Sequence, residues 1–312
     1  MQLSSRFVLS CVLLASSLLT LPAQASVGAW IQEKALGLEQ SLADLERRDI
    51  QIDDHVIPTF VRNIDSDEPC AILVHGFTAR AAHWFRLARH LPKEKCVVAM
   101  DLAGFGDATF HADGAYDAAS QAHRVAKLMQ ALELKQPADV MGNSMGGYIL
   151  AQLAVLHPEL VNSLTLLNAS GVSSPEPSTL AKQIAADQNG FFAKDLEGFE
   201  QFYAMTMSEP PFVPGIVREA VGRLAISRIS RHQYIFEQVR TTVMDDDLRK
   251  IKAPTLIVWG DEDHLLHVSM TKTWRTIPES RVFIYRGIGH MPHLERPKQT
   301  ATLFHRFTTK QL

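Results

Sequence analysis

The chain has 312 residues, of which 46% are hydrophobic and 21% are charged. This composition is that of an ordinary globular protein, and the length allows one large core or a core with an inserted subdomain. The formal net charge of −3 gives no electrostatic reason to expect nucleic acid or an anionic membrane surface as a partner.

The N-terminus has the features of an export signal. "MQLSSRF" carries one arginine, "VLSCVLLASSLLTL" is an apolar run, and "PAQA" ends it with small residues at Ala23 and Ala25. The pattern predicts a secretory signal peptide over residues 1–25, and therefore a periplasmic or secreted protein. The alternative is an uncleaved membrane anchor, which the shortness of the run and its serines disfavour. Cys11 lies inside the run rather than after it, which disfavours a lipoprotein.

Cleavage would leave two cysteines, Cys70 and Cys96, in an oxidising compartment. Each lies five residues before a motif residue, His75 or Asp101. If both segments are neighbouring parallel strands in register, the cysteines lie side by side. A disulfide and a pair of buried free thiols both remain open, because adjacent parallel strands fit disulfide geometry poorly.

From the N-terminus, residues 30–48 predict a helix with an apolar face on the core, and residues 50–63 an antiparallel hairpin. Apolar strands and amphipathic helices then alternate. The predicted strands lie within residues 70–77, 96–106, 138–144, 161–170, 253–268 and 280–297, and the helices within 81–91, 118–134, 146–158, 270–277 and 298–312. Apolar strands that alternate with amphipathic helices in this way predict an α/β fold with a mostly parallel sheet covered on both faces.

The alternation stops between residues 171 and 248. This segment shows no convincing buried strand and contains several prolines and helical stretches. Aromatic residues and methionines cluster in this segment, and they form the interior of a small helical subdomain, the lining of an apolar pocket, or both. They are Phe191, Phe192, Phe199, Phe202, Tyr203, Met205, Met207 and Phe212. We therefore expect a core over residues 26–170 and 249–312, interrupted by a helical cap over 171–248.

The sequence "GNSMGG" places Ser144 between a predicted strand and a predicted helix. The G-x-S-x-G pattern is weak alone but is strengthened by this strand–turn–helix setting. Gly142 and Gly146 remove side chains where a sharp turn would crowd them. Ser144 is therefore the candidate nucleophile.

A serine hydroxyl needs a base, and the candidate is His290 in the loop after the last predicted strand. His293 is the alternative. His264 and His267 could suggest a metal pair, but no Cys or acidic cluster with metal spacing supports one. We therefore expect no metal and no cofactor.

The base in turn needs a carboxylate, and the loop after the strand in "WGDEDH" offers Asp261, Glu262 and Asp263. Spacing alone does not choose among them. An oxyanion hole would take one N–H from Met145, the residue after the nucleophile. The second would come from Phe77 in the loop "HGFTAR".

Five motifs are spread along the chain: "HGF" at 75, "DLAGFGDA" at 101, "GNSMGG" at 142, "WGDED" at 259 and "GIGHMPHLERP" at 287. Together they resemble the motifs of the α/β-hydrolase superfamily. The motifs occur in the order of that family and span the chain from about residue 50 to its end. The resemblance implies that Asp263 is the acid, because the family's aspartate lies three residues after the glycine of W-G-x-x-D. It also implies a helical insertion after the sixth strand.

Ser144 excludes the haloalkane dehalogenase and epoxide hydrolase branches, which have aspartate at this position. Two serine branches share G-N-S-M-G-G: secreted bacterial lipases and esterases, and meta-cleavage C–C bond hydrolases. The signal peptide and the segment "HGFTARAAHW" favour the first. The resemblance therefore implies a serine carboxylic-ester hydrolase, a lipase or carboxylesterase acting through an acyl-enzyme. The alternatives are a C–C bond hydrolase, a cofactor-free haloperoxidase-like member or a non-catalytic binding protein on the same fold.

We expect Phe202 and Met205 to contact the acyl chain of a small-molecule or lipid ester. His75 and Asn143 are expected to shape the site rather than react. Transient contact with a lipid interface fits such a substrate, and no nucleic acid or obligate protein partner is implied.

Overall fold

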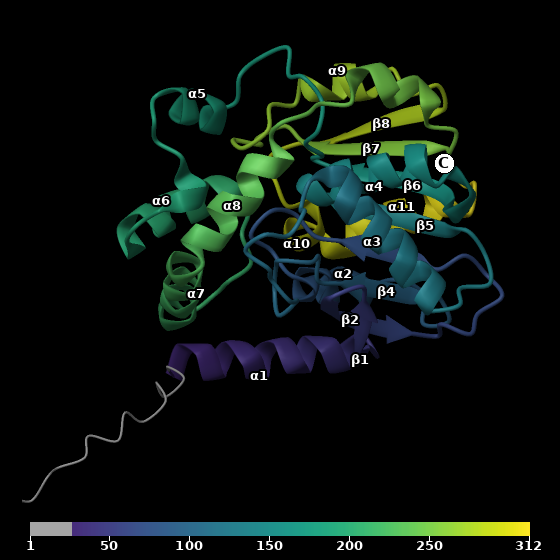
Figure 1. Ribbon diagram of the computed structural model, residues 1–312, viewed down its shortest axis with the longest axis horizontal. Helices are drawn as coiled ribbons and strands as arrows, with labels where there is room; N and C mark the ends of the chain where they lie inside the picture. Colours follow the sequence, from purple (N-terminus) through teal and green to yellow (C-terminus); the bar gives the residue numbers. More distant parts are fainter. Residues whose placement is uncertain (1–26) are drawn as a thin grey trace, which may run out of the picture.

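The computed structural model describes residues 27–312, so the predicted signal peptide lies outside the described residues. The molecule is built on a twisted sheet of eight strands in the order β1-β2-β4-β3-β5-β6-β7-β8 (Figure 1). Strands β3 to β8 pair in parallel, whereas β2 is antiparallel to both β1 and β4. The strands are β1 (Glu46–Ile52), β2 (His55–Arg62), β3 (Ala71–Val74), β4 (Val97–Met100), β5 (Ala138–Asn143), β6 (Val161–Leu167), β7 (Thr255–Gly260) and β8 (Ser280–Tyr285). The predicted mostly parallel α/β fold is confirmed.

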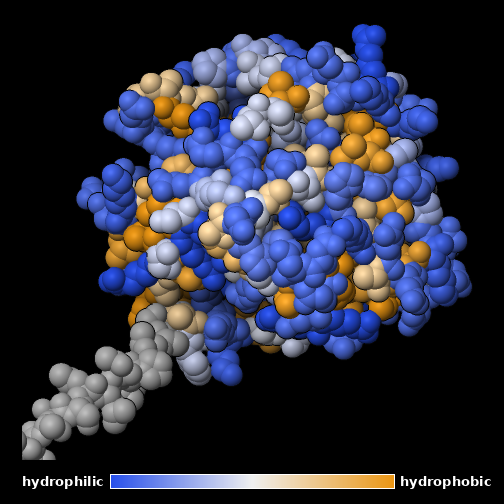
Figure 2. Space-filling view, viewed as in Figure 1, coloured by the Kyte–Doolittle hydropathy of each residue, from blue (hydrophilic) through white to orange (hydrophobic). Residues whose placement is uncertain are grey.

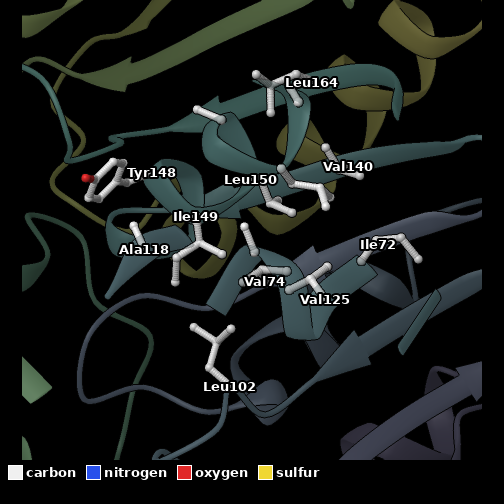
Figure 3. Packing of buried hydrophobic residues seen from close by; sticks show 14 of the residues in the cluster. Ile72, Val74, Leu102, Ala118, Val125, Val140, Tyr148, Ile149, Leu150 and Leu164 are labelled. Carbon is white, nitrogen blue, oxygen red and sulfur yellow. The ribbon is translucent and has the colours of Figure 1, made fainter. Parts of the chain in front are cut away.

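Helices cover both faces of the sheet, and the central strands are therefore buried on both sides. Ile72 and Val74 of β3 point into one core, which is closed by α3 (Ala118–Ala131), α4 (Met145–Leu156) and α9 (Met270–Trp274) (Figure 3). Leu73, between them, points into the other core, under α2 (Phe85–Ala88) and α11 (Pro297–Thr308). This alternation explains why the strands appear as continuous apolar runs.

The first helix differs from the prediction. Helix α1 spans Val27–Leu42, and the chain is already a strand from Glu46. The charges after the helix pair at a spacing of two, Arg47 with Asp49 and Arg48 with Glu46, which places partners on one face of an exposed edge strand. Helix α1 contacts α7 (Gly215–Ser227) at one end (Figure 1), and its Leu36 packs against the core under α2.

The segment between β6 and β7 is helical, and the described residues there contain no strand. It comprises α5 (Thr179–Ala185), η3 (Gly190–Phe192), α6 (Leu196–Thr206), α7, α8 (Ile229–Val239) and η4 (Asp245–Lys250). We call residues 171–248 the helical insertion. The face in Figure 2 is mostly polar, with small groups of apolar side chains, several over the insertion at the left. Within residues 27–312, no helix is long and apolar enough to cross a membrane.

Cys70 and Cys96 form a disulfide at the start of β3 and β4. These strands pair in parallel with Ala71 opposite Val97, so the two preceding residues lie side by side with their Cα atoms 4.5 Å apart. Both cysteines are buried. The bond therefore joins neighbouring strands at the amino end of the sheet, opposite the loops that carry the candidate site.

Candidate active site

Ser144 sits on a strained turn between β5 and α4. Its backbone has φ 55° and ψ −123°, a conformation that is costly for a residue with a side chain. The turn is closed by glycines: a Cβ at Gly142 would lie 2.4 Å from the carbonyl carbon of Gly146, and one at Gly146 would lie 2.3 Å from the carbonyl oxygen of Val74. Only glycine allows these close approaches, so the sequence forces the serine out of the sheet.

Two backbone N–H groups flank Ser144. Met145 is the first residue of α4, where N–H groups have no intrahelical acceptor. Phe77 follows Gly76, and because Gly76 has no side chain the loop can approach the serine closely: a Cβ at Gly76 would lie 3.0 Å from Ser144 Cβ. Within residues 27–312, neither the Phe77 nor the Met145 N–H is hydrogen-bonded to protein. Both are therefore free to stabilise a negatively charged oxygen near Ser144.

His290 and Asp263 lie in contact after strands β8 and β7. Nδ1 of His290 is 2.8 Å from Oδ2 of Asp263, and the two residues are only 3% and 6% exposed. The other carboxylate oxygen, Oδ1, accepts hydrogen bonds from the N–H groups of Leu265 and Leu266 at 2.8 and 3.0 Å. The carboxylate thus holds Nδ1 of the imidazole and leaves Nε2 for another partner.

The other candidates lie elsewhere. Asp261 is exposed and accepts a hydrogen bond from Gly287 N–H at 2.7 Å, and Glu262 is also exposed. The ring of His293 packs against that of Trp84, with centroids 4.4 Å apart. Burial lowers the pKa of His293 well below its ordinary value, so it remains neutral, and it does not line the cavity at Ser144.

Ser144 and His290 both line a cavity of about 320 Å³ between the sheet and the helical insertion. Most of its wall is apolar; the residues include Tyr148, Val172, Leu180, Ile184, Phe191, Phe236, Val239, Leu265 and Met270. Within the described residues no hydrogen bond joins Ser144 Oγ to His290, although both residues line this cavity.

Phe202 lines a small neighbouring cavity of about 30 Å³ that also contacts Ser144 and His290. Its ring packs on that of Phe191, with centroids 4.7 Å apart. Met205 lines neither cavity, although it lies on the same helix α6. Of the two residues expected to contact an acyl chain, the structure therefore brings only Phe202 to the site.

The chain is similar to known proteins both in sequence and in structure. Residues 72–209 match a family model described as the alpha/beta hydrolase fold. A crystal structure of a membrane phospholipase A, described as a bacterial virulence factor, superposes with a TM-score of 0.87 at 33% identity, covering 91% of this chain and 92% of that one. The chain belongs to the α/β-hydrolase superfamily. It is also 28% identical to Lipase 3 of Moraxella sp. (strain TA144) and to Lipase 1 of Psychrobacter immobilis, in each case over 88% of both chains.

In this α/β hydrolase, two polar residues near the site were not anticipated from the sequence. Asn168, just after β6, donates a hydrogen bond of 2.7 Å to Asp263 Oδ2. Glu295, five residues after His290, is buried and accepts hydrogen bonds from the N–H groups of Gly289 and Met291, on either side of His290. Asn168 follows an apolar strand, and Glu295 lies in "GIGHMPHLERP", but neither position indicates a partner. Asn143, expected to shape the site, donates to the carbonyl oxygens of Leu167 and His290.

His75 also shapes the loop beside Ser144. Its Nδ1 lies 2.8 Å from the carbonyl oxygen of Gly76, and its Nε2 accepts a hydrogen bond from Leu102 N–H at 3.0 Å. Both ring nitrogens are therefore satisfied in the neutral form. Burial lowers the pKa of His75 to about 4, which keeps it neutral.

The described part of this hydrolase has one group with the spacing of metal ligands: Asp54, His55 and His111, whose ligand atoms lie within 4.8 Å of one another. It lies at the β1–β2 turn, and Nε2 of His111 is already 3.1 Å from the carbonyl oxygen of Asp54. His264 and His267 are not part of such a group; Nδ1 of His267 instead contacts Ser269 Oγ at 2.9 Å.

Proposed function

We propose that this protein is a serine hydrolase of carboxylic esters, a lipase or carboxylesterase, in which Ser144 is the nucleophile. One observation carries the proposal: Ser144, on its left-handed turn, faces the same apolar cavity as His290, whose Nδ1 is held by a buried carboxylate. The lipase names of the curated relatives support the same reaction class.

In the proposed mechanism, Nε2 of His290 takes the proton of Ser144 Oγ as that oxygen attacks the ester carbonyl carbon. The resulting oxyanion accepts hydrogen bonds from the N–H groups of Phe77 and Met145. The imidazolium is stabilised by Asp263 and returns its proton to the departing alcohol, leaving an acyl-enzyme. A water molecule then repeats the steps: His290 takes its proton, the acyl carbon is attacked, and Ser144 leaves as the hydroxyl.

The substrate is proposed to be a lipid ester whose acyl chain enters the cavity. The walls come from the sheet side, with Tyr148 and Met270, and from the helical insertion, with Leu180 and Phe236. Burial of an acyl chain on these side chains would contribute about 0.8 kcal/mol for each CH₂ group. We therefore propose that the helical insertion, residues 171–248, acts as a cap over the acyl site.

We further propose that the protein is exported through the signal peptide predicted for residues 1–25. Disulfides persist in oxidising compartments and are rare in the cytosol of mesophiles, so the bond between Cys70 and Cys96 supports export. Fractionation of cells that express the full chain tests this, because export places the processed protein in the periplasm or the medium.

The decisive experiment compares purified residues 26–312 with the Ser144→Ala variant on p-nitrophenyl esters from acetate to palmitate. The variant should fold normally and lose at least about 10³-fold in kcat. Rates that rise toward long chains indicate a lipase, and a maximum at short chains indicates an esterase. If no ester is hydrolysed in a Ser144-dependent way, the proposal fails, and C–C bond cleavage and peroxidase assays become the next tests.

A further inference from the structure

Glu295 binds two segments that are distant in sequence. It ends the short helix α10 (Pro292–Glu295) and is 7% exposed. In the loop around His290, its carboxylate accepts hydrogen bonds from the N–H of Gly289 at 3.1 Å and of Met291 at 3.2 Å. In the helical insertion, the same carboxylate accepts hydrogen bonds from the N–H of Ser208 and Glu209, at 2.9 and 2.8 Å.

The two segments also touch directly. The N–H of His290 donates to the carbonyl oxygen of Thr206 at 3.0 Å. A Cβ added at Gly289 would lie 2.7 Å from the Ser208 nitrogen, so only glycine lets the histidine loop approach this closely. Residues 206–209 and 289–291 are therefore packed backbone against backbone, with one carboxylate between them.

The chemistry explains why a carboxylate is needed here. An ionised carboxylate offers only acceptors, and its two oxygens can satisfy several N–H groups at once. Without it, these donors would lose their protein acceptor, and the cost would be greatest at Gly289, which is buried, whereas Ser208 and Glu209 are exposed residues. A glutamine of the same size would turn an amide N–H₂ toward groups that also donate.

We propose that Glu295 is a positioning residue that fixes the catalytic histidine loop to the helical insertion, so that the place of His290 depends on the insertion above it. This inference rests on the proposed function, since it assigns His290 the role of base. Glu295 does not touch the substrate cavity. Its loss should therefore lower kcat through the misplaced imidazole and leave KM nearly unchanged.

The test uses residues 26–312 and the Glu295→Gln variant. We expect kcat to fall about 10- to 100-fold and KM to change by less than about twofold. Gly289→Ala, which pushes the two segments apart, should give the same pattern. Circular dichroism and thermal melting establish that each variant is folded before its rates are compared.

The matched control is Asp139→Asn. Asp139 is also a buried carboxylate, bound by Lys95 Nζ, Asn162 Nδ2 and Ser163 Oγ at 2.8, 2.7 and 2.8 Å, but it lies at the other end of β5 from Ser144. This variant should lower the melting temperature and leave kcat within about twofold of the parent. If both carboxylate variants reduce kcat equally for a given loss of stability, Glu295 is only structural and the inference is overturned.

Amide hydrogen exchange separates failure of this inference from failure of the proposed function, because it needs no activity. In Glu295→Gln, exchange should accelerate together at residues 206–209 and 289–291, and Asp139→Asn should leave both segments protected. Unchanged exchange in Glu295→Gln overturns the positioning role, whatever reaction the enzyme catalyses. If amide exchange accelerates in both segments but the protein hydrolyses no ester, the positioning role of Glu295 stands and the ester-hydrolase function is rejected.

Discussion

Asn168 donates a hydrogen bond of 2.7 Å to Oδ2 of Asp263, the same oxygen that lies 2.8 Å from Nδ1 of His290. The amide and the imidazole therefore share one oxygen of the carboxylate, while backbone N–H groups of Leu265 and Leu266 hold the other. Asn168 has φ 45°, a left-handed conformation that asparagine tolerates better than most residues. We predict that Asn168→Ala lowers kcat about tenfold, because one hydrogen bond to a buried carboxylate is lost. Steady-state kinetics on a short ester checks this, and an unchanged kcat would contradict it.

Replacing the carboxylate itself should be much more damaging. Asp263→Asn should reduce kcat by up to about 10⁴-fold, because an amide stabilises the wrong tautomer of the histidine and no longer stabilises the imidazolium. Asp261→Asn is the natural control, since Asp261 is exposed and contacts the Gly287 N–H instead. Its kcat should change by less than about threefold. The reverse ranking would assign the acid to Asp261.

Substitutions in helix α6 should distinguish residues that contact the acyl chain from residues that only stabilise the helical insertion. Phe202 lines a cavity at Ser144, whereas Phe199 packs inside the insertion against Tyr203, with ring centroids 6.0 Å apart, and lines no cavity at the serine. Phe202→Ala should reduce kcat/KM more for long-chain than for short-chain esters. Phe199→Ala and Met205→Ala should change all chain lengths by the same factor. A uniform loss for Phe202→Ala would make that residue structural as well.

Acid should destabilise the fold through His75. Its pKa is about 4 when folded, against an ordinary value of 6.5, because burial disfavours the charged ring. Between these pH values the unfolded chain binds a proton that the folded chain does not, so the free energy of unfolding falls as the pH is lowered from 6.5 to 4. The loss from this group approaches about 3 kcal/mol.

Urea unfolding at several pH values measures this dependence, and imidazole ¹⁵N shifts follow His75 directly. The ring should stay neutral, with its proton on Nδ1, down to about pH 4. A midpoint for His75 near 6.5 in the folded protein would contradict the prediction.

Removing the disulfide should lower stability without abolishing activity. Cys70 and Cys96 are 26 residues apart in sequence and lie at the end of the sheet away from Ser144. Closing a loop of this length restricts the unfolded chain by roughly 3.5 kcal/mol on the chain-entropy model. The Cys70→Ala/Cys96→Ala double variant should therefore melt several degrees lower, with kcat within about twofold of the parent at 25 °C. An unchanged melting temperature would show that the bond does not stabilise the fold.

Local sequence patterns correctly predicted the central sheet, the helices between its strands and the turn at Ser144. The apolar runs at β3 to β7 and the helical periodicity between them predicted the parallel sheet, because burial on both faces needs continuous apolar strands. The glycines around Ser144 predicted its turn, because the crowding they relieve involves residues within a few positions. Residues 43–48 were predicted wrongly as helix: Ala43 and Asp44 form a turn, and Glu46, Arg47 and Arg48 pair with β2, because propensity and charge there allow either structure and the partner strand decides it.

Contacts between distant segments were decided only by the tertiary structure. Residue spacing left Asp261, Glu262 and Asp263 open, and the fold turns only Asp263 toward His290. Pairing of Cys70 with Cys96 depended on the order of strands in the sheet, which no local pattern states. The links from Asn168 and from Glu295 join segments more than 80 residues apart. Sequence patterns encode what neighbours along the chain require, whereas these partners are chosen by how the two faces of the sheet and the helical insertion pack together.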